Sequence, residues 1–444
     1  MCLAAVVLWT GCIAYHPQPL EPEKSEAALR ARSAQDPGLA DFVRARDAGA
    51  AWPPTKFDLT ALTFMALYFQ PDIEMARARV RSAQAAEITE GARPNPTLSV
   101  LPTRVVSSFP DEPPWMMAAS LDVPIETAGK RSKRLEQARE ATRAARLALS
   151  ETSWSVRAKV RAALVEYIEA RAELGLFREE AAETETWSRM LAGRLAAGDI
   201  SRFDLTLAQN ETLNAQLAFQ AAQTRVATAK TALSAAVGVT AAGLEGMAIE
   251  WSGFDQPPTN FDMGRVQEIG LTHRLDVQRA LAEYASVEAA LKLAVAQQYP
   301  DIHLDPGYEF DQGEHKFSLG PSITLPVLDR NRGPIAEGLA RRDESAAAFL
   351  SLQSDAIHQM EAAQVDYGAA VEAWRATDRI AGEVQKRLEV GAERELEAGE
   401  TDRATVLQAR LQRSAALRAR LAAARKVQDA LGELENAVQQ EIKN

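Results

Sequence analysis

The sequence predicts a mostly helical, internally duplicated chain in which long antiparallel coiled-coil helices are interrupted by two pairs of short β-strands. Residues 126–197 contain no proline and carry a heptad pattern of apolar residues, which is typical of a long packed helix. Landmark residues recur at an offset of about 200 positions, which indicates a repeat. Aromatic residues make up only 6 % of the chain and charged residues 25 %, a composition typical of coiled coils.

The segment 126–197 is predicted to pack against neighbours on two sides. One apolar seam with 4-3-4-3 spacing consists of Val156, Val160, Ala163, Tyr167, Ala170, Leu174 and Phe177. A second seam consists of Ala158, Ala162, Val165, Ala172 and Leu176, with Glu169 as its one polar position. The seams start two residues apart, which is about 200° around a helix. We therefore expect a stave in a curved wall, with a helix on each flank.

The bulk properties limit the partners and the mode of membrane contact. A net charge of −11 argues against a nucleic-acid partner, because binding phosphates requires a basic surface. After residue 12, no apolar stretch approaches the length of about 20 residues that a transmembrane helix needs. Any passage through a membrane would therefore have to use β-strands.

The N-terminus is similar to a bacterial lipoprotein signal. A short apolar run ends in Thr10 and Gly11 before Cys12, so we expect a signal peptide over 1–11 and acylation of Cys12. The alternative is an incidental apolar terminus. Residues 12–56 are polar and rich in proline, which predicts an extended lead segment with at most a short helix near 25–32.

Prolines and glycines set the expected element boundaries of the first repeat. Pro94 and Pro96 end a helix that begins at Asp58 or Thr60, and Pro124 closes a strand pair. Gly198 marks a turn between two helices. Repeat 1 (57–238) is therefore predicted to contain a helix at 57–92, strands at 97–107 and 115–125, a long helix at 126–197 and a helix at 201–237.

The second repeat has the same order after a linker at 239–261. Pro300 follows Pro96 by 204 residues, Pro326 follows Pro124 by 202, and Gly399 follows Gly198 by 201. Repeat 2 (262–438) is predicted to contain a helix at 262–298, strands at 301–310 and 316–327, a long helix at 334–397 and a helix at 401–438, followed by a tail at 439–444. In each repeat the two shorter helices together roughly match the long one, so we expect them to lie end to end beside it.

Four strands cannot close a membrane barrel by themselves, since the smallest such barrels have eight. An open sheet would leave unpaired backbone groups in lipid, each at a cost of several kcal/mol. The chain is therefore expected to associate with copies of itself. A cyclic trimer would supply twelve strands, although physics alone does not favour three copies over another number.

Four motifs flank the predicted strands: the strand starts Pro94-Asn95-Pro96 and Tyr299-Pro300-Asp301, and the strand exits VPIETAGKR at 123–131 and LPVLDRNRG at 325–333. Together with the order of elements, they resemble the TolC-like outer-membrane efflux proteins, and most of all the outer-membrane subunits of cobalt–zinc–cadmium-type metal pumps. The resemblance covers about residues 57–438. It implies a homotrimer with a twelve-stranded barrel in the bacterial outer membrane and an α-helical tunnel (an α-helical barrel) reaching into the periplasm. It further implies a non-enzymatic efflux channel that docks onto a periplasmic adaptor protein and an inner-membrane pump of the resistance–nodulation–division class.

Two helix-to-helix turns are candidate sites at the end away from the strands. Glycine as a C-cap followed by Ser201 or Thr401 as the next N-cap explains them structurally. A ring of carboxylates around a narrowing tunnel is the functional interpretation, since such rings favour cations. The resemblance also implies that this end is the closable aperture and the adaptor contact. The candidate residues are Gly198, Asp199, Asp204, Gly399, Glu400 and Asp402.

Basic residues gather where each long helix starts, although cations there oppose the helix dipole. Their place just below the strands predicts contact with lipid phosphates at the membrane rim. A solvated charged face is an equal alternative. The cluster comprises Lys130, Arg131, Lys133 and Arg134 and, in the second repeat, Arg330, Arg332, Arg341 and Arg342.

No pattern of catalytic, cofactor-binding or metal-ligating residues stands out, so we expect neither an enzyme nor a cofactor. The five histidines lack ligand spacing; they are His16, His273, His303, His315 and His358. One alternative is a drug or protein-secretion duct of the same fold. The alternative from another class is a soluble coiled-coil scaffold, which would not explain four strand segments at a fixed repeat.

Overall fold

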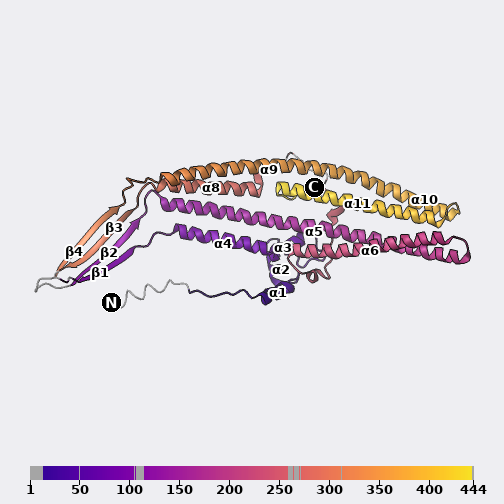
Figure 1. Cartoon of the computed structure of the whole chain (residues 1–444), viewed down its shortest axis with the longest axis horizontal. Coiled ribbons are helices and arrows are strands. Elements are labelled where there is room, and N and C mark those ends of the chain that lie inside the picture. The colour runs from indigo at the N-terminus through magenta and orange to yellow at the C-terminus, as the bar shows by residue number, and fades with distance from the viewer. Residues whose placement is uncertain are drawn as a thin grey trace.

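The computed structural model describes residues 14–49, 51–104, 106, 115–258, 264, 270, 272–311 and 313–442. The molecule is elongated, with a β-sheet at one end and long helices running away from it (Figure 1). The predicted signal peptide at 1–11 and Cys12 lie outside the described residues. Most of the residues predicted for the loop between the first two strands also lie outside them.

The prediction of an extended lead segment is wrong for part of it. Helix α1 (Pro22–Ala31) agrees roughly with the short helix predicted near 25–32, but α2 (Pro37–Arg44) has no predicted counterpart. Pro22 and Pro37 occupy the first helical turn, where a missing N–H costs nothing, so these prolines start helices. Asp36 caps α2 by accepting hydrogen bonds from the backbone N–H of Gly38 and Leu39. Leu39 and Val43 of α2 are then fully buried in the main core.

Truncation of Leu39 should therefore release the lead segment from the helical body. We expect Leu39→Ala to weaken this docking by about 2–5 kcal/mol, because it leaves a cavity in a packed core. Limited trypsin digestion should then cut faster after Arg44 and Arg46 than in the wild type. Leu29→Ala in α1 is the matched control, since Leu29 is exposed and should be tolerated. Equal digestion rates for both variants would contradict the docking.

The helix predicted at 57–92 is two helices, α3 (Leu59–Phe69) and α4 (Pro71–Gly91). Asp58 caps the first of them, as expected, by accepting from the N–H of Ala61. The break falls at Gln70 because Pro71 disfavours a helical conformation in the residue before it. Gln70 is extended (ψ 124°) and serves as the last position of α3 and the first of α4.

The long helix α5 (Lys130–Ala197) has 68 residues and begins four residues later than predicted. Ala128 and Gly129 precede it with positive φ of 54° and 68°, so the chain turns sharply between strand and helix. Its C-terminal end is as predicted: Gly198 adopts φ 81° and is followed by α6 (Arg202–Val237). The predicted linker contains two 3₁₀ turns, η1 (Ala241–Leu244) and η2 (Ser252–Asp255), whose Leu244 and Phe254 are buried.

The second repeat follows the predicted order. Helix α8 (Leu275–Ala296) is described, whereas most of the predicted helix before residue 272 lies outside the described residues. The predicted long helix is α9 (Arg332–Arg379), a π-helical turn η3 (Ile380–Val384) and α10 (Gln385–Ala398). Helix α11 (Arg403–Val438) completes the repeat. Its N-cap is Asp402 and not the predicted Thr401, because the Asp402 carboxylate accepts from the N–H of Thr405.

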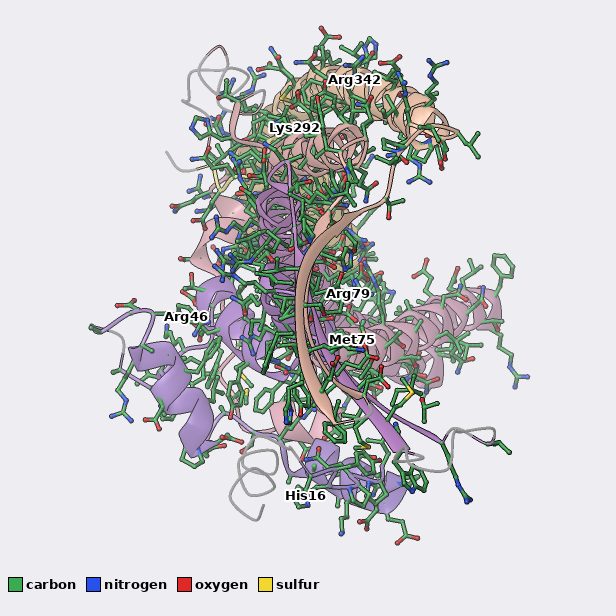
Figure 2. The ribbon with its side chains drawn as sticks, turned by 90° about the vertical axis from the view of Figure 1, so that its left-hand side faces the viewer. His16, Arg46, Met75, Arg79, Lys292 and Arg342 are labelled. Carbon is green, nitrogen blue, oxygen red and sulfur yellow. The ribbon has the colours of Figure 1, made fainter. Side chains whose placement is uncertain are left out.

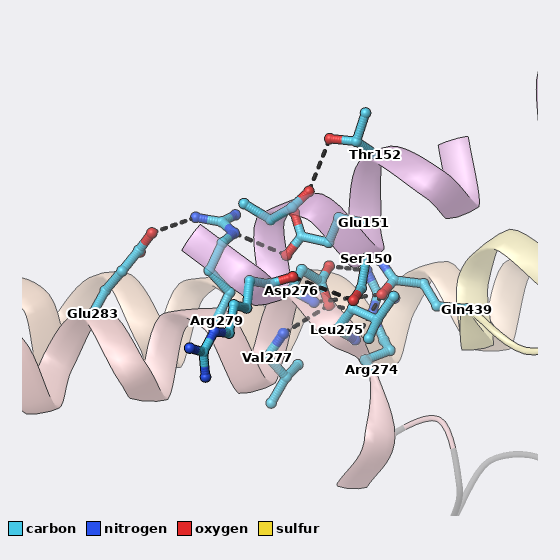
Figure 3. Close-up of polar contacts among 12 residues, drawn as sticks. Ser150, Glu151, Thr152, Arg274, Leu275, Asp276, Val277, Arg279, Glu283 and Gln439 are labelled. Atoms are coloured by element: carbon cyan, nitrogen blue, oxygen red, sulfur yellow. Dashed lines mark hydrogen bonds and ion pairs between the residues drawn. The ribbon is translucent and has the colours of Figure 1, made fainter. Parts of the chain in front are cut away.

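The shorter helices lie end to end beside the long ones, as their lengths predict: α4 and α6 beside α5, and α8 and α11 beside α9 (Figure 1). In repeat 1, the side-chain amide of Gln70 donates to the carbonyls of Ala235 and Ala236 at 2.6 Å. The residue before α4 thus supplies hydrogen bonds to carbonyls at the end of α6 that lack partners within their own helix. In repeat 2, Arg274 before α8 donates to the carbonyl of Ala437 at 2.8 Å. In the other direction, the side chain of Gln439 after α11 accepts a hydrogen bond from the N–H of Leu275 at the start of α8, at 2.7 Å (Figure 3).

Helix α5 has neighbours on both flanks, as expected, although Ala162 and Ala172 of the predicted second seam are exposed. It packs against α3, α4 and α6 on one side and against α8 and α11 on the other. Val156 and Val160 of the first seam belong to the core with α3 and the end of α6. Val165 of the second seam packs with Phe254 and with Ala424 of α11.

The four strands form one antiparallel sheet in the order β1-β2-β3-β4. Strand β2 (Trp115–Ile125) matches its prediction; β1 (Thr97–Arg104) ends earlier than predicted, and residues 105 and 107 lie outside the described part. Strand β3 (Ile302–Asp311) is close to its prediction, but β4 (Glu314–Ile323) begins two residues before and ends four residues before its predicted bounds. Pro326 lies beyond the end of β4, in the connector to α9. Strands from the two repeats meet in the β2–β3 pair.

Candidate channel surfaces

One face of the sheet is almost entirely apolar. Strand alternation places every second residue on the same face, and the register joins Val100 to Ala119, Ala119 to Tyr308 and Tyr308 to Phe317. The large apolar side chains on this face are Leu98, Val100, Trp115, Met117, Leu121, Val123, Ile125, Ile302, Leu304, Tyr308, Phe310, Phe317, Leu319 and Ile323. All of them are exposed or half-buried, so no segment among the described residues covers this face. Its polar members, Arg104 beside Trp115 and His315 beside Phe310, lie at the end of the sheet away from the helices.

The opposite face is polar and mostly acidic. Its charged side chains are Asp122, His303, Asp305, Glu309, Asp311, Glu314 and Lys316. His303 Nδ1 and Asp122 Oδ1 are 2.8 Å apart, and Lys316 donates to Asp311 at 2.6 Å. Carboxylates therefore outnumber basic groups on this face. Strands with one apolar and one polar face are typical of a wall between lipid and water.

The two predicted aperture turns lie together at the end of the molecule opposite the sheet (Figure 1). Gly198 and Gly399 are left-handed C-caps with φ 81° and 74°. Asp204 forms a capping box with Ser201, the N-cap of α6. The hydroxyl and the backbone N–H of Ser201 donate to the Asp204 carboxylate and lower its pKa. Asp402 is itself the N-cap of α11, and its carboxylate accepts from the N–H and the hydroxyl of Thr405. The turns thus have the predicted structural role, while Asp199 and Glu400 are exposed.

A groove of about 440 Å³ lies beside these turns, between α5 and the α10–α11 pair. Sequence reasoning missed it, because its walls come from different repeats. Its apolar lining includes Trp187 and Met190, and Arg410 approaches Glu183 at 3.5 Å. Burial raises the pKa of the Glu183 carboxyl, while Arg410 opposes that rise.

The basic residues at the start of α5 are held by contacts within the chain. Lys130 is buried and donates to Asp301 at 2.8 Å, and the N–H of Thr127 donates to the same carboxylate at 2.9 Å. Burial favours a higher pKa for Asp301, but these two hydrogen bonds outweigh it and lower the pKa. Arg134 forms an ion pair with Glu126. These contacts attach the start of α5 to the residues that follow β2 and precede β3.

The remaining basic residues are more accessible. Arg131 donates to the carbonyl of Gly91 at 2.5 Å, and Lys133 lies 3.5 Å from Glu136. Arg330 and Arg332, near the start of α9, are exposed. Farther along α9, Arg341 and Arg342 pair with Glu337 and Asp343. Contact of this cluster with lipid phosphates stays a prediction.

Lys130→Met should make the junction between sheet and helix less stable and less sensitive to acid. The lowered pKa of Asp301 means that its pairing stabilises the fold above its ordinary pKa of 3.8, and that this stability is lost as pH falls through the folded value. We expect a loss of about 1.5 kcal/mol at neutral pH and a flatter acid dependence of the thermal midpoint. Lys133→Met, which removes only a half-exposed pair, is the control; an equal effect of both variants would contradict the assignment.

The polar break in the second seam of α5 is an ion-pair cluster that joins three helices. Glu169 is buried, with 5 % exposure, and lies between Arg225 of α6 and Arg425 of α11. Arg425 reaches Glu169 at 2.8 Å and Glu166 at 2.5 Å, and Arg225 also pairs with Glu173. The cluster therefore connects the two repeats through α5. Only the position of Glu169 in an apolar seam hinted at it.

Within the part of the chain that the structure describes, no three His, Cys, Asp or Glu side chains lie together as a metal site would require. In the same residues, no helix combines the length and the apolar character needed to cross a membrane.

The duplicated helices, the two-faced sheet and the turns at the far end define a family. The chain belongs to the outer membrane efflux protein family, whose sequence profile matches residues 64–239 and 268–438, more than half of the chain. The two matched ranges fall on the two repeats. The resemblance to TolC-like outer-membrane efflux proteins is confirmed.

Individual relatives are more distant. The cobalt-zinc-cadmium resistance protein CzcC of Cupriavidus metallidurans is 26 % identical over 235 residues, which are 52 % of this chain and 55 % of the relative. The alignment thus spans about half the length of that protein. A membrane protein of Pseudomonas aeruginosa has a TM-score of 0.71 at 20 % identity, over 86 % of this chain and 92 % of that one. The outer membrane protein VceC of Vibrio cholerae has a TM-score of 0.68 at 20 % identity, over 86 % and 96 %. The two structures share the fold.

Proposed function

We propose that three copies of this chain form a closed channel in the bacterial outer membrane, with a twelve-stranded barrel continued by a helical tunnel into the periplasm. The observation that carries the proposal is the four-stranded sheet, which is apolar on one face, polar on the other and unpaired at both outer strands. Lipid would cover the apolar face and water the polar face. Backbone groups at the outer strands need partners in lipid, and pairing between copies supplies them.

The flanks of the helical body support ring formation by head-to-tail contacts. One flank exposes apolar residues of α4 and α6, namely Met75, Ile88, Phe203, Leu207, Leu213 and Leu217. The other exposes Leu350 and Val365 of α9 and Ile380 of η3. Seen from the strand end, Met75 and Arg79 of α4 lie apart from Lys292 of α8 and Arg342 of α9 (Figure 2). Two different surfaces that meet around a rotation axis generate a closed ring.

The substrates we propose are heavy-metal cations. The polar face carries an excess of carboxylates, which would recur around the lumen and favour cations over anions. The similarity to a cobalt-zinc-cadmium resistance protein supports the same class. A multidrug or protein-secretion duct of the same fold is the alternative.

The turns and the groove beside Trp187 are proposed as the aperture and the contact with a periplasmic adaptor, which would connect the channel to an inner-membrane pump of the resistance–nodulation–division class. The exposed Arg330 and Arg332 are proposed to contact lipid phosphates. Acylation of Cys12 would add a lipid anchor.

Deletion of the gene in its native host tests the substrate class. We expect increased sensitivity to cobalt, zinc or cadmium salts, restored by the wild-type gene, with unchanged sensitivity to dyes and antibiotics. Sensitivity to organic compounds alone would favour the multidrug alternative. Recovery of the protein in the soluble fraction would instead support a coiled-coil scaffold.

A further inference from the structure

The connector that follows β4 exposes apolar side chains. Strand β4 ends at Ile323, and residues 324–331 lead to the start of α9. In this connector Leu325 is 71 % exposed, Val327 73 % and Leu328 99 %. Three such side chains within four residues are costly in water and indicate a surface that another molecule covers.

A pocket of about 690 Å³ lies at the foot of the opposite edge of the sheet. It is lined by residues 93–96 before β1, residues 123–126 at the end of β2, and Arg131. Three prolines, Val123 and Ile125 supply apolar walls, and the charged lining residues are Arg93, Arg131 and Glu126. We call it the junction pocket, because strands and helices meet there.

Strand directions bring the connector and the junction pocket together when copies associate. Strand β1 starts at the helical end of the sheet and β4 finishes there, and both are outer strands. Because neighbours in this sheet are antiparallel, β4 of one copy can extend the ladder by pairing with β1 of the next. The exit of β4 then lies beside the start of β1 of the neighbouring copy.

We infer that the connector of each copy docks in the junction pocket of the next copy through Leu325, Val327 and Leu328. Both surfaces carry both signs of charge, Asp329 and Arg330 in the connector and Arg93, Arg131 and Glu126 in the pocket, so opposite charges can pair across the contact. This contact would seal each seam between copies at the boundary of sheet and helices. The inference rests on the proposed ring, whose existence is tested separately in the same samples.

Photo-crosslinking tests the docking without assuming a register. A benzophenone amino acid replaces Leu328 in the full chain, and the membrane-embedded protein is irradiated. The expected product is a covalent dimer in which position 328 is joined to residues 93–96 or 123–131 of a second chain, identified by mass spectrometry of the band. The same replacement at Leu20, which is 97 % exposed in the lead segment, should not give this product.

Each other outcome overturns the inference. Crosslinks to lipid alone would assign the connector to the membrane, and crosslinks within one chain would place it elsewhere. An unboiled band of three chain masses without the expected crosslink would keep the proposed ring and reject the docking. A monomer on the same gel would reject both.

A milder substitution gives an independent readout. Leu328→Ser should lower the temperature at which the unboiled oligomer dissociates, because the serine loses apolar contact in the assembly only. Leu20→Ser, the same change at a side chain of nearly equal exposure, should leave that temperature unchanged. Equal behaviour of the two variants would show that Leu328 is not covered by a neighbour.

Discussion

Leu319→Arg should abolish stable insertion of the barrel or reduce it strongly. Leu319 lies near the middle of β4, on the apolar face that we assign to lipid. An arginine on the lipid face near the bilayer midplane costs about 2–4 kcal/mol, and three copies would carry three of them. The amount of heat-modifiable oligomer recovered from outer membranes measures the effect.

Ser318→Arg is the matched control, because it places the same side chain one residue earlier on the polar face. Water in the lumen would solvate that arginine, so oligomer yield should stay near the wild-type level. If Ser318→Arg disrupted assembly and Leu319→Arg did not, the two faces would be assigned the wrong way round. Equal tolerance would argue against membrane insertion of this sheet.

Arg274→Met should cause the largest loss of stability in the helical body. Arg274 is buried, with 4 % exposure, and its guanidinium contacts Asp276 at 2.6 Å, Gln359 at 3.1 Å and the carbonyl of Ala437 (Figure 3). Its removal leaves the half-buried Asp276 carboxylate and a helix-end carbonyl without this partner and empties a buried site, at a cost of about 3–5 kcal/mol. The thermal midpoint of the helical circular dichroism signal measures this loss.

The pH dependence of the variant gives a second check. Burial favours a higher pKa for Asp276, but the hydrogen bonds and charge of Arg274 lower it, so the pairing stabilises the fold at neutral pH and is lost in acid. Arg274→Met should therefore differ most from the wild type at neutral pH. Arg279→Met is the control, since Arg279 is half-exposed and bridges Glu151 and Glu283, a loss of about 1 kcal/mol or less. A similar midpoint for both variants would contradict the role of Arg274.

Local sequence patterns predicted the order of elements because each is encoded by nearby residues. The proline-free run of α5, the prolines beside the strand pairs and the glycines of the two turns act within a few residues of themselves. The incorrect helix predictions also come from interpreting local patterns. Pro37 lies in the proline-rich segment predicted to be extended, and Pro71 lies inside the helix predicted at 57–92, yet each occupies the first turn of a helix. Helix α2 depends on burial of Leu39 against a distant core, which no local pattern reveals.

The candidate surfaces were predictable where periodicity defines them and not where distant segments meet. The strand segments were predicted locally, but the two faces of the sheet follow from its register, which across the β2–β3 pair joins residues nearly 200 positions apart. Lys130 looked like part of a lipid-contacting patch, whereas its contact with Asp301 depends on the strand pairing. The groove beside Trp187 and the cluster around Glu169 likewise need both repeats.

The mass of the detergent-solubilised protein, measured by native mass spectrometry after recovery from outer membranes, tests the central claim most directly. The proposed channel predicts an assembly of three chains that persists without crosslinking, since the outer strands and the two flanks are all paired only in a closed ring. A protein recovered from the soluble fraction as one or two chains would contradict the account.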